Sequence, residues 1–241
     1  MQFWQLPGSD HKLGNWNEKA CGPQNETTLA NALAMSCNTA FANLGLELGA
    51  DAIAQQAKKF GFDTSFEIPL ISAASHFPTN LDQAQTAMSA IGQYDVQASA
   101  LQMAMVTAAI ANDGVLMKPY LVDQILGTDL SVLENAAPQA ISRAMKPENA
   151  KVLRTMMVGV VTNGTGSNAQ ISGVNVGGKT GTAENTPGQS AHAWFVGLAP
   201  AEGAKVAVAV VLQNGGGATE VSGNALAAPI AQSVMRAVLG R

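Results

Sequence analysis

The chain has 241 residues, 47% of them hydrophobic, so it is long enough to bury the core of one large domain or two small ones. Its 13 Lys and Arg residues against 17 Asp and Glu residues give a formal charge of −4, which argues against nucleic-acid binding by electrostatic attraction. The longest apolar stretches, residues 98–111 and 206–212, are too short to cross a bilayer. The first residues also lack the basic start and long apolar run of a signal peptide.

The first part of the chain predicts an arm followed by helices. Residues 1–26 are rich in Gly, Pro, Asn and Trp without a helical period, which predicts an irregular arm. Residues 27–170 are expected to be mainly helical, with a loop over 62–80 and an extended piece over 118–122. Capping residues and apolar spacing predict five helices, over residues 27–35, 39–49, 51–60, 97–112 and 147–163. The fifth helix should bury a stripe formed by Val152, Met156 and Val160.

Residues 171–241 are predicted to form C-terminal strands and a closing helix. Three strand-like runs, over 174–184, 192–199 and 205–213, are separated by short turn-rich segments, as is typical of antiparallel neighbours. A final helix is expected over 220–239. Helices followed by consecutive strands and a last helix predict an α+β fold with an antiparallel sheet flanked by helices. We interpret residues 1–241 as one incomplete domain of this kind.

Two short motifs carry the functional signal. Ser36-Cys37-Asn38 falls between two predicted helices, and Lys179-Thr180-Gly181-Thr182 lies in a predicted strand. Either motif alone is weak, but their order, separation and contexts together resemble the penicillin-recognising serine enzymes. The resemblance extends over residues 92–96, 101–104, 111–114, 163–166 and 192–197. The chain is most similar to class B, monofunctional penicillin-binding proteins of actinobacterial type.

The resemblance implies a serine β-lactamase/penicillin-binding transpeptidase-like fold and a D,D-transpeptidase that cross-links D-Ala-D-Ala stem peptides of peptidoglycan by serine acyl transfer. The implied partners are these stem peptides and β-lactam antibiotics, with no cofactor. In this family Ser36 would relay a proton towards the leaving amine. Asn38 would bind the substrate's backbone amide and orient the catalytic lysine. Lys179 would place a positive charge beside the substrate's terminal carboxylate.

The residues after Lys179 are expected to bind substrate. The hydroxyls of Thr180 and Thr182 can reach the carboxylate, and the N–H of Thr182 can donate to a developing oxyanion. Gly181 lacks the side chain that would block a substrate lying along the strand.

Three further side chains are candidates for supporting this site. Glu184 is either a group behind the lysine or a solvated charge at the strand end, and His192 is expected in the strand that lines the cleft. Trp194 touches either the cleft or only the core. His11, His76 and His192 are too far apart in sequence to predict a metal site.

The family's nucleophile motif, Ser-x-x-Lys at a helix start, is expected several tens of residues before Ser36. The one formal match, Ser9 to Lys12, has no apolar helical stripe after it and is interpreted as a solvated turn. We therefore expect the C-terminal part of a transpeptidase domain that cannot acylate itself. Its parent protein would act on the extracytoplasmic side of the cell envelope, anchored by an upstream transmembrane helix. Surface left by the absent helix could promote self-association.

Several alternatives stay open at this stage. Cys21 and Cys37 either form a disulfide that rigidifies the first motif or are two unpaired core residues. The fold could serve a non-catalytic D-Ala-D-Ala or β-lactam binding or sensing domain, a D,D-carboxypeptidase or a β-lactamase. Residues 173–180 formally match a phosphate-binding P-loop, but Gly181 follows the Lys-Thr pair where a helix should begin.

Overall fold

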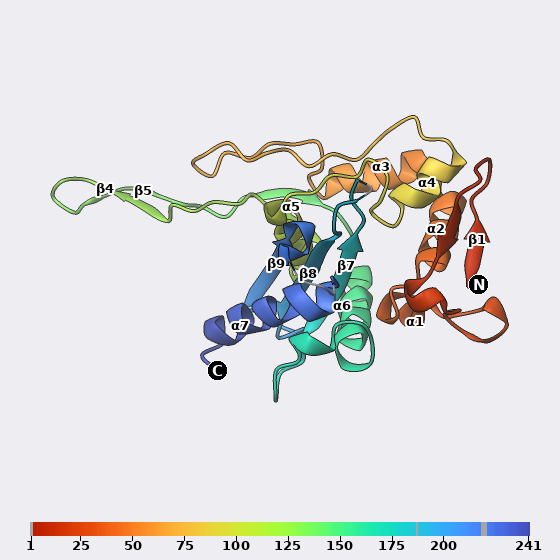
Figure 1. Ribbon diagram of the computed structural model, residues 1–241. Helices are drawn as coiled ribbons and strands as arrows, with labels where there is room; N and C mark the ends of the chain where they lie inside the picture. The colour runs from red at the N-terminus through yellow and green to blue at the C-terminus, as the bar shows by residue number, and fades with distance from the viewer. Residues whose placement is uncertain (1, 187, 218–220) are drawn as a thin grey trace.

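The computed structural model describes residues 2–186, 188–217 and 221–241 (Figure 1). A three-stranded sheet forms its centre, made of β7 (Gly177–Ala183), β8 (His192–Ala199) and β9 (Val206–Leu212). The strands are antiparallel in the order β7-β8-β9, so β7 forms one edge of the described sheet. The predicted α+β fold with an antiparallel sheet is confirmed.

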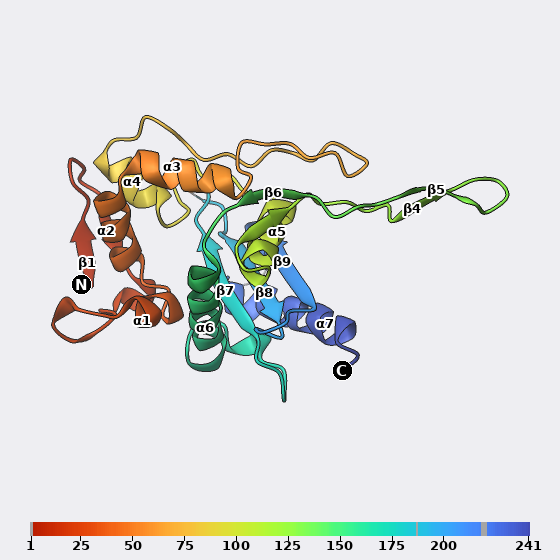
Figure 2. The same ribbon diagram turned by 180° about the vertical axis from the view of Figure 1, so that it is seen from behind.

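Helices cover both faces of this sheet. In Figure 1, α7 (Ala228–Val238) lies in front of the strands, whereas the view from behind in Figure 2 shows α5 (Ala100–Ala111) in front. The long helix α6 (Pro147–Asn163) packs along β7. The main core joins the sheet to α7 through fully buried side chains that include Phe195 and Met235.

The described structure contains all five helices that the sequence predicts before the sheet. Besides α5 and α6, they are α1 (Leu29–Ala34), α2 (Asn38–Leu48) and α3 (Ala50–Lys59). A further helix, α4 (Gln83–Ser89), was not predicted. Among the described helices, none is long and apolar enough to span a membrane.

The N-terminal arm differs from the prediction of irregular structure. It begins with a hairpin of β1 (Phe3–Gln5) and β2 (Lys12–Gly14), followed by 3₁₀ turns η1 (Trp16–Glu18) and η2 (Pro23–Asn25). The hairpin forms because Leu6 and Leu13 are buried against α2 and α4, a long-range contact that local composition does not reveal.

The extended piece predicted over 118–122 lies outside the strands and joins β3 (Val115–Met117), which pairs with β6 (Ala140–Arg143), to a ribbon of β4 (Gln124–Leu126) and β5 (Val132–Asn135). The buried stripe predicted for the fifth helix was partly wrong. On α6, Val152 is exposed, and the buried side chains are Ala150, Met157, Val160 and Val161. The helix is turned so that this set faces the sheet.

The closing helix starts later than expected. A π-helical turn, η5 (Gly223–Ala227), precedes α7, and Ser222 accepts a hydrogen bond from the Ala225 N–H at its start. Residue Glu220, where the predicted helix begins, lies outside the described residues.

Candidate active site

Ser36 occupies an unusual backbone position at the end of α1. Its N–H donates to the carbonyl of Leu33 (3.2 Å) and the next N–H, of Cys37, donates to the carbonyl of Ala32 (2.9 Å). These two bonds form a Schellman cap, in which the residue at the position of Ser36 is left-handed and is usually glycine. Ser36 has φ of 55°, so the fold holds a serine where glycine would be less strained.

The hydroxyl presented by this cap meets the second motif. The Lys179 ammonium donates to Ser36 Oγ (2.7 Å) and to the carbonyl oxygen of Thr180 (2.7 Å), although Ser36 and Lys179 are 143 residues apart in sequence. Lys179 comes from β7, the edge strand of the sheet. The structure thus brings together two of the three residues expected to be catalytic.

The environment of Lys179 changes its acid strength. Burial lowers the pKa of the ammonium from 10.5 to about 8, because the charged form loses hydration. A lysine with such a pKa can release its proton near neutral pH far more easily than an exposed lysine.

Thr165, which was not among the predicted site residues, links the strand of Lys179 to the end of α1. Thr165 follows α6, and its Oγ1 lies 2.7 Å from Thr180 Oγ1 while its N–H donates to the carbonyl of Ala34 (3.0 Å). A side chain at Gly164 would overlap the Ala34 carbonyl, so glycine permits this close approach. The sequence signal was the Asn-Gly-Thr-Gly pattern over 163–166, which belongs to the family resemblance.

Asn38 has a contact that differs from its expected one. Its Nδ2 donates to the backbone carbonyl of Gly14 (3.0 Å), at the end of β2. Nearby, the Oδ1 of buried Asn15 accepts from the N–H of Thr39 (2.9 Å) and thereby caps the first turn of α2. The hairpin arm therefore holds the start of the helix that follows Ser36.

A disulfide lies at the middle of the first motif. Cys21 and Cys37 are joined with their Cα atoms 6.1 Å apart, which ties the arm to the residue between Ser36 and Asn38. Asn31 strengthens the same connection, since its Nδ2 donates to the carbonyl of Cys21 (2.8 Å). The backbone before Ser36, at Asn31, and the backbone after it, at Cys37, are therefore both held to the arm.

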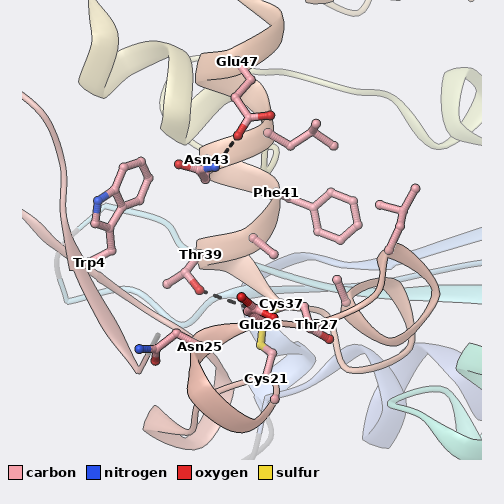
Figure 3. A pocket seen from close by; sticks show the side chains of 15 residues that line it. Trp4, Cys21, Asn25, Glu26, Thr27, Cys37, Thr39, Phe41, Asn43 and Glu47 are labelled. Carbon is pink, nitrogen blue, oxygen red and sulfur yellow. Dashed lines mark hydrogen bonds between the residues drawn. A yellow bond between two sulfur atoms is a disulfide. The ribbon is translucent and has the colours of Figure 1, made fainter.

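The disulfide also borders a pocket of about 550 Å³ between the arm and α2. Figure 3 shows the indole of Trp4 and the ring of Phe41 on its sides, with Glu47 further along α2. Neither Ser36 nor Lys179 lines this pocket, so it is separate from the pair of motif side chains.

The other predicted residues of β7 and β8 lie close to this pair in the sheet. Gly181 pairs with Trp194, and a Cβ added to Gly181 would lie 3.1 Å from the Trp194 Cβ, so the half-buried indole starts directly beside the strand. A side chain at Gly223 of η5 would overlap the Gly181 backbone. His192 sits two residues before Trp194 on the same face, and its Nδ1 accepts from the Asn214 N–H (3.0 Å).

Thr182 and Glu184 lie further along the strand. Thr182 pairs with Ala193 and is half-buried, on the opposite face of the sheet from Lys179. Glu184 follows the last residue of β7 and is exposed, which fits the interpretation as a solvated charge at the strand end.

The formal Ser-x-x-Lys match has no helical geometry. Ser9 lies in the turn of the β1–β2 hairpin, where its Oγ accepts from the His11 N–H (3.1 Å), and Lys12 is in β2. A strand does not stack residues i and i+3 as a helix does, so this match lacks the arrangement of the motif. The P-loop alternative is also contradicted, because Lys179 lies inside a strand and no helix begins there. Within the described ranges, no three His, Cys, Asp or Glu side chains cluster as a metal site.

Comparison with known proteins agrees with this geometry. The family described as the penicillin binding protein transpeptidase domain matches residues 2–236. The chain therefore belongs to the penicillin-binding protein transpeptidase family, as its two motifs predict, and no comparison supports a nucleotide-binding fold.

Within this family, the chain is similar to mycobacterial proteins. It is 43% identical to the peptidoglycan D,D-transpeptidase PbpA of Mycolicibacterium smegmatis over 97% of this chain and 48% of the relative. It is 40% identical to PbpA of Mycobacterium tuberculosis over the same shares. The structure of penicillin-binding protein A from M. tuberculosis as a ceftriaxone acyl-enzyme complex matches with a TM-score of 0.94 and 39% identity, over 99% of this chain and 54% of that one. The chain thus spans about half the length of these relatives.

Proposed function

We propose that this chain is the motif-bearing part of a D,D-transpeptidase domain that binds D-Ala-D-Ala stem peptides of peptidoglycan and β-lactams that resemble them. The observation that carries this proposal is the 2.7 Å hydrogen bond from Lys179 Nζ to Ser36 Oγ at the edge of the sheet. Relatives named as peptidoglycan D,D-transpeptidases, and a structural relative solved with penicillin G as an acyl-enzyme complex, support it.

The pair can relay a proton. Because Lys179 donates to Ser36 Oγ, the hydroxyl proton of Ser36 is free to point towards a substrate. When an amine leaves, Ser36 donates this proton to it and accepts one from Lys179. The lowered pKa of Lys179, about 8, reduces the free energy of this proton transfer. The ammonium becomes neutral, and the relay is reset by a proton from the attacking amine.

The same strand can bind the substrate's terminal carboxylate. In the proposal, Lys179 supplies the positive charge, and Thr180 and Thr182 supply hydroxyls at the strand edge. The hydroxyl of Thr165 lies 2.7 Å from that of Thr180, so it holds the Thr180 side chain in a fixed rotamer. We propose Asn38 as a ligand of the substrate amide, with Trp194 and His192 lining the cleft.

We assign no nucleophile to these residues, because the single Ser-x-x-Lys match lies in a hairpin turn. We place the parent protein on the extracytoplasmic side of the envelope, anchored by a transmembrane helix outside this sequence. The disulfide supports an oxidising compartment. Self-association is a separate expectation, which sedimentation velocity over a range of concentrations would test.

Reversible binding of N-acetyl-D-Ala-D-Ala, followed by calorimetry between pH 6.5 and 9.5, tests the substrate-binding part. Affinity should be highest below pH 8, where Lys179 is charged, and should fall by up to about tenfold per pH unit above it. A Lys179→Gln variant should bind weakly with no such dependence. Equal affinity of parent and variant for this ligand would contradict the proposed site.

Intact mass after incubation with benzylpenicillin, with peptide mapping of any adduct, tests the assignment of the nucleophile. We expect no covalent adduct together with retained reversible binding. A stable adduct would show that a nucleophile lies within the 241 residues, with Ser9 and Ser36 the first residues to map. If the protein formed no adduct and also showed no reversible binding, the result would contradict the transpeptidase proposal itself.

A further inference from the structure

Two long segments project from the body of the molecule in the same direction (Figures 1 and 2). The loop projection comprises residues 62–75, between α3 and α4. The ribbon projection comprises residues 118–139 and contains the β4–β5 pair. Neither carries a residue of the candidate active site, so any role of these projections is additional to the proposed chemistry.

Both projections expose large apolar side chains. At the tip of the loop projection, Leu70 and Ile71 are 79% and 80% exposed. On the ribbon projection, Leu121, Leu130 and Leu133 are 76%, 76% and 68% exposed. An isolated two-stranded ribbon is only marginally stable in water, and several large apolar side chains exposed on neighbouring segments are typical of an interaction surface.

A hollow of about 310 Å³ lies at the base of the ribbon and is lined from both projections. Glu67 comes from the loop projection, whereas Lys118, Tyr120, Asp123 and Glu134 come from the ribbon projection. Three carboxylates against one ammonium give this lining a net charge of −2. Among the described residues, none of these carboxylates forms an ion pair. The hollow therefore suits a positively charged side chain.

Charge also discriminates among the partners that could cover the apolar side chains. The two projections together contain Asp63, Glu67, Asp123, Asp129 and Glu134 against Lys118, which gives five negative charges, one positive charge and a net of −4. An anionic membrane surface or a second copy of the same acidic surface would be repelled. A basic, apolar protein segment would be attracted.

We infer that the loop and ribbon projections form a docking surface for a segment of a partner protein in which apolar side chains flank a lysine or arginine. The apolar residues would cover Leu121 and Leu133, and the cationic head group would enter the hollow between Glu67 and Glu134. Apolar contact supplies most of the affinity, while the carboxylates select the sign of the partner's charge.

Selection of a random twelve-residue peptide library on the 241-residue protein tests this inference. We expect enriched peptides to carry a lysine or arginine between apolar residues. Their binding, measured by fluorescence polarisation, should weaken about tenfold or more in a Leu121→Ser/Leu133→Ser variant and in a Glu67→Gln/Glu134→Gln variant. Reversing the peptide's basic residue to glutamate should weaken binding to the parent to a similar degree.

A Val234→Ser/Val238→Ser variant is the matched control, because these valines are exposed on α7, away from both projections, at 43% and 56%. It should bind the peptides like the parent, and thermal melting should show that all variants fold. Peptides without a basic residue, equal binding to all variants, or no enrichment at all would overturn the inference. Two other results would also overturn the inference. One is binding of the parent protein to phosphatidylcholine/phosphatidylglycerol vesicles that the Leu121→Ser/Leu133→Ser variant lacks. The other is dimerisation of the parent protein that this variant lacks.

Discussion

Ser36 shows how a single residue can favour chemistry at the expense of stability. It takes the left-handed position of a helix cap, with φ of 55°, where glycine is the residue of lowest energy. We predict that Ser36→Gly raises the free energy of unfolding by about 1 kcal/mol, because the left-handed conformation costs a non-glycine residue roughly 1–2 kcal/mol. Urea denaturation monitored by circular dichroism would measure the change.

Ser36→Ala is the control for this effect. It removes the same hydroxyl but keeps a Cβ at the strained position, so its free energy of unfolding should not rise. If both variants were equally stabilised, the gain would come from removing the hydroxyl beside Lys179, and backbone strain would not explain it.

A second prediction at the scale of one residue concerns Lys179 and the pH dependence of the free energy of unfolding. Its folded-state pKa of about 8 lies below the ordinary value of 10.5, so the unfolded chain binds more protons between these pH values. Stability therefore rises with pH through this window, by an amount on the order of 3 kcal/mol for this group. Relative to the parent, Lys179→Met should be most stable below pH 8 and should lose this advantage by pH 10.5.

The measurement is the difference in free energy of unfolding between parent and variant at several pH values. Taking the difference removes the titration of the other lysines and tyrosines, which both proteins share. Lost hydrogen bonds to Ser36 and Thr180 shift the difference by a constant. A difference that does not change between pH 7 and 10.5 would contradict the buried position of the ammonium.

At the scale of elements, α2 depends on a residue outside it for its cap. Asn15 accepts the hydrogen bond from Thr39 N–H, whereas the N-cap residue, Cys37, makes no side-chain cap bond because its sulfur is in the disulfide. Asn15→Ala should lower the free energy of unfolding by about 1 kcal/mol or more. Asn15→Asp keeps the accepting oxygen but replaces the Nδ2 that donates to the Lys19 carbonyl (3.0 Å) by a second oxygen. Its loss in thermal denaturation should be smaller than that of Asn15→Ala if the bond accepted from Thr39 contributes more than the bond donated to Lys19, and an equal or larger loss would show that it does not.

Elements with strong local signals were predictable from the sequence. The sequence predicts helix starts at Thr27 or Thr28 for α1, about Gln97 for α5 and Pro147 for α6, each followed by apolar residues at helical spacing. In the structure these helices begin at Leu29, Ala100 and Pro147. The sequences of β8 and β9 are apolar and bounded by turns. The predicted ends of these strands, 192–199 and 205–213, therefore agree with the structure to within one residue. For these elements, local pattern and tertiary packing favour the same conformation.

Elements with weak or conflicting signals were missed. The helix α4 has only seven residues, and its clearest marker was the capping box of Asp82 and Gln85. Strands β4 and β5 are exposed along their whole length, so no alternation of apolar and polar residues identifies them. Thr165 was missed as a site residue because its contact with Thr180 depends on how α6 packs against the sheet.

At the scale of the molecule, the candidate site joins two parts of the chain that fold differently. Ser36 follows a short helix in the helical part, and Lys179 lies in the sheet, so their hydrogen bond requires both parts to keep their relative position. The contacts of Thr165 with Ala34 and Thr180 bridge the same junction. A site built in this way is sensitive to any change that loosens the arm, even one distant from the motifs.

The Cys21–Cys37 disulfide is the covalent link between the arm and the first motif, and the last prediction concerns its removal. It closes a loop with a sequence separation of 16 residues and joins the arm to the backbone between Ser36 and Asn38. A cross-link of this loop length contributes about 3 kcal/mol by restricting the unfolded chain. A Cys21→Ser/Cys37→Ser variant should therefore unfold with a free energy lower by about that amount in urea, and it should bind N-acetyl-D-Ala-D-Ala less tightly because the Ser36 cap loses its anchor. Dithiothreitol should destabilise the parent to the same degree and leave the variant unchanged. If the reductant destabilised both proteins equally, or neither, the disulfide would not hold the arm and the first motif together in solution.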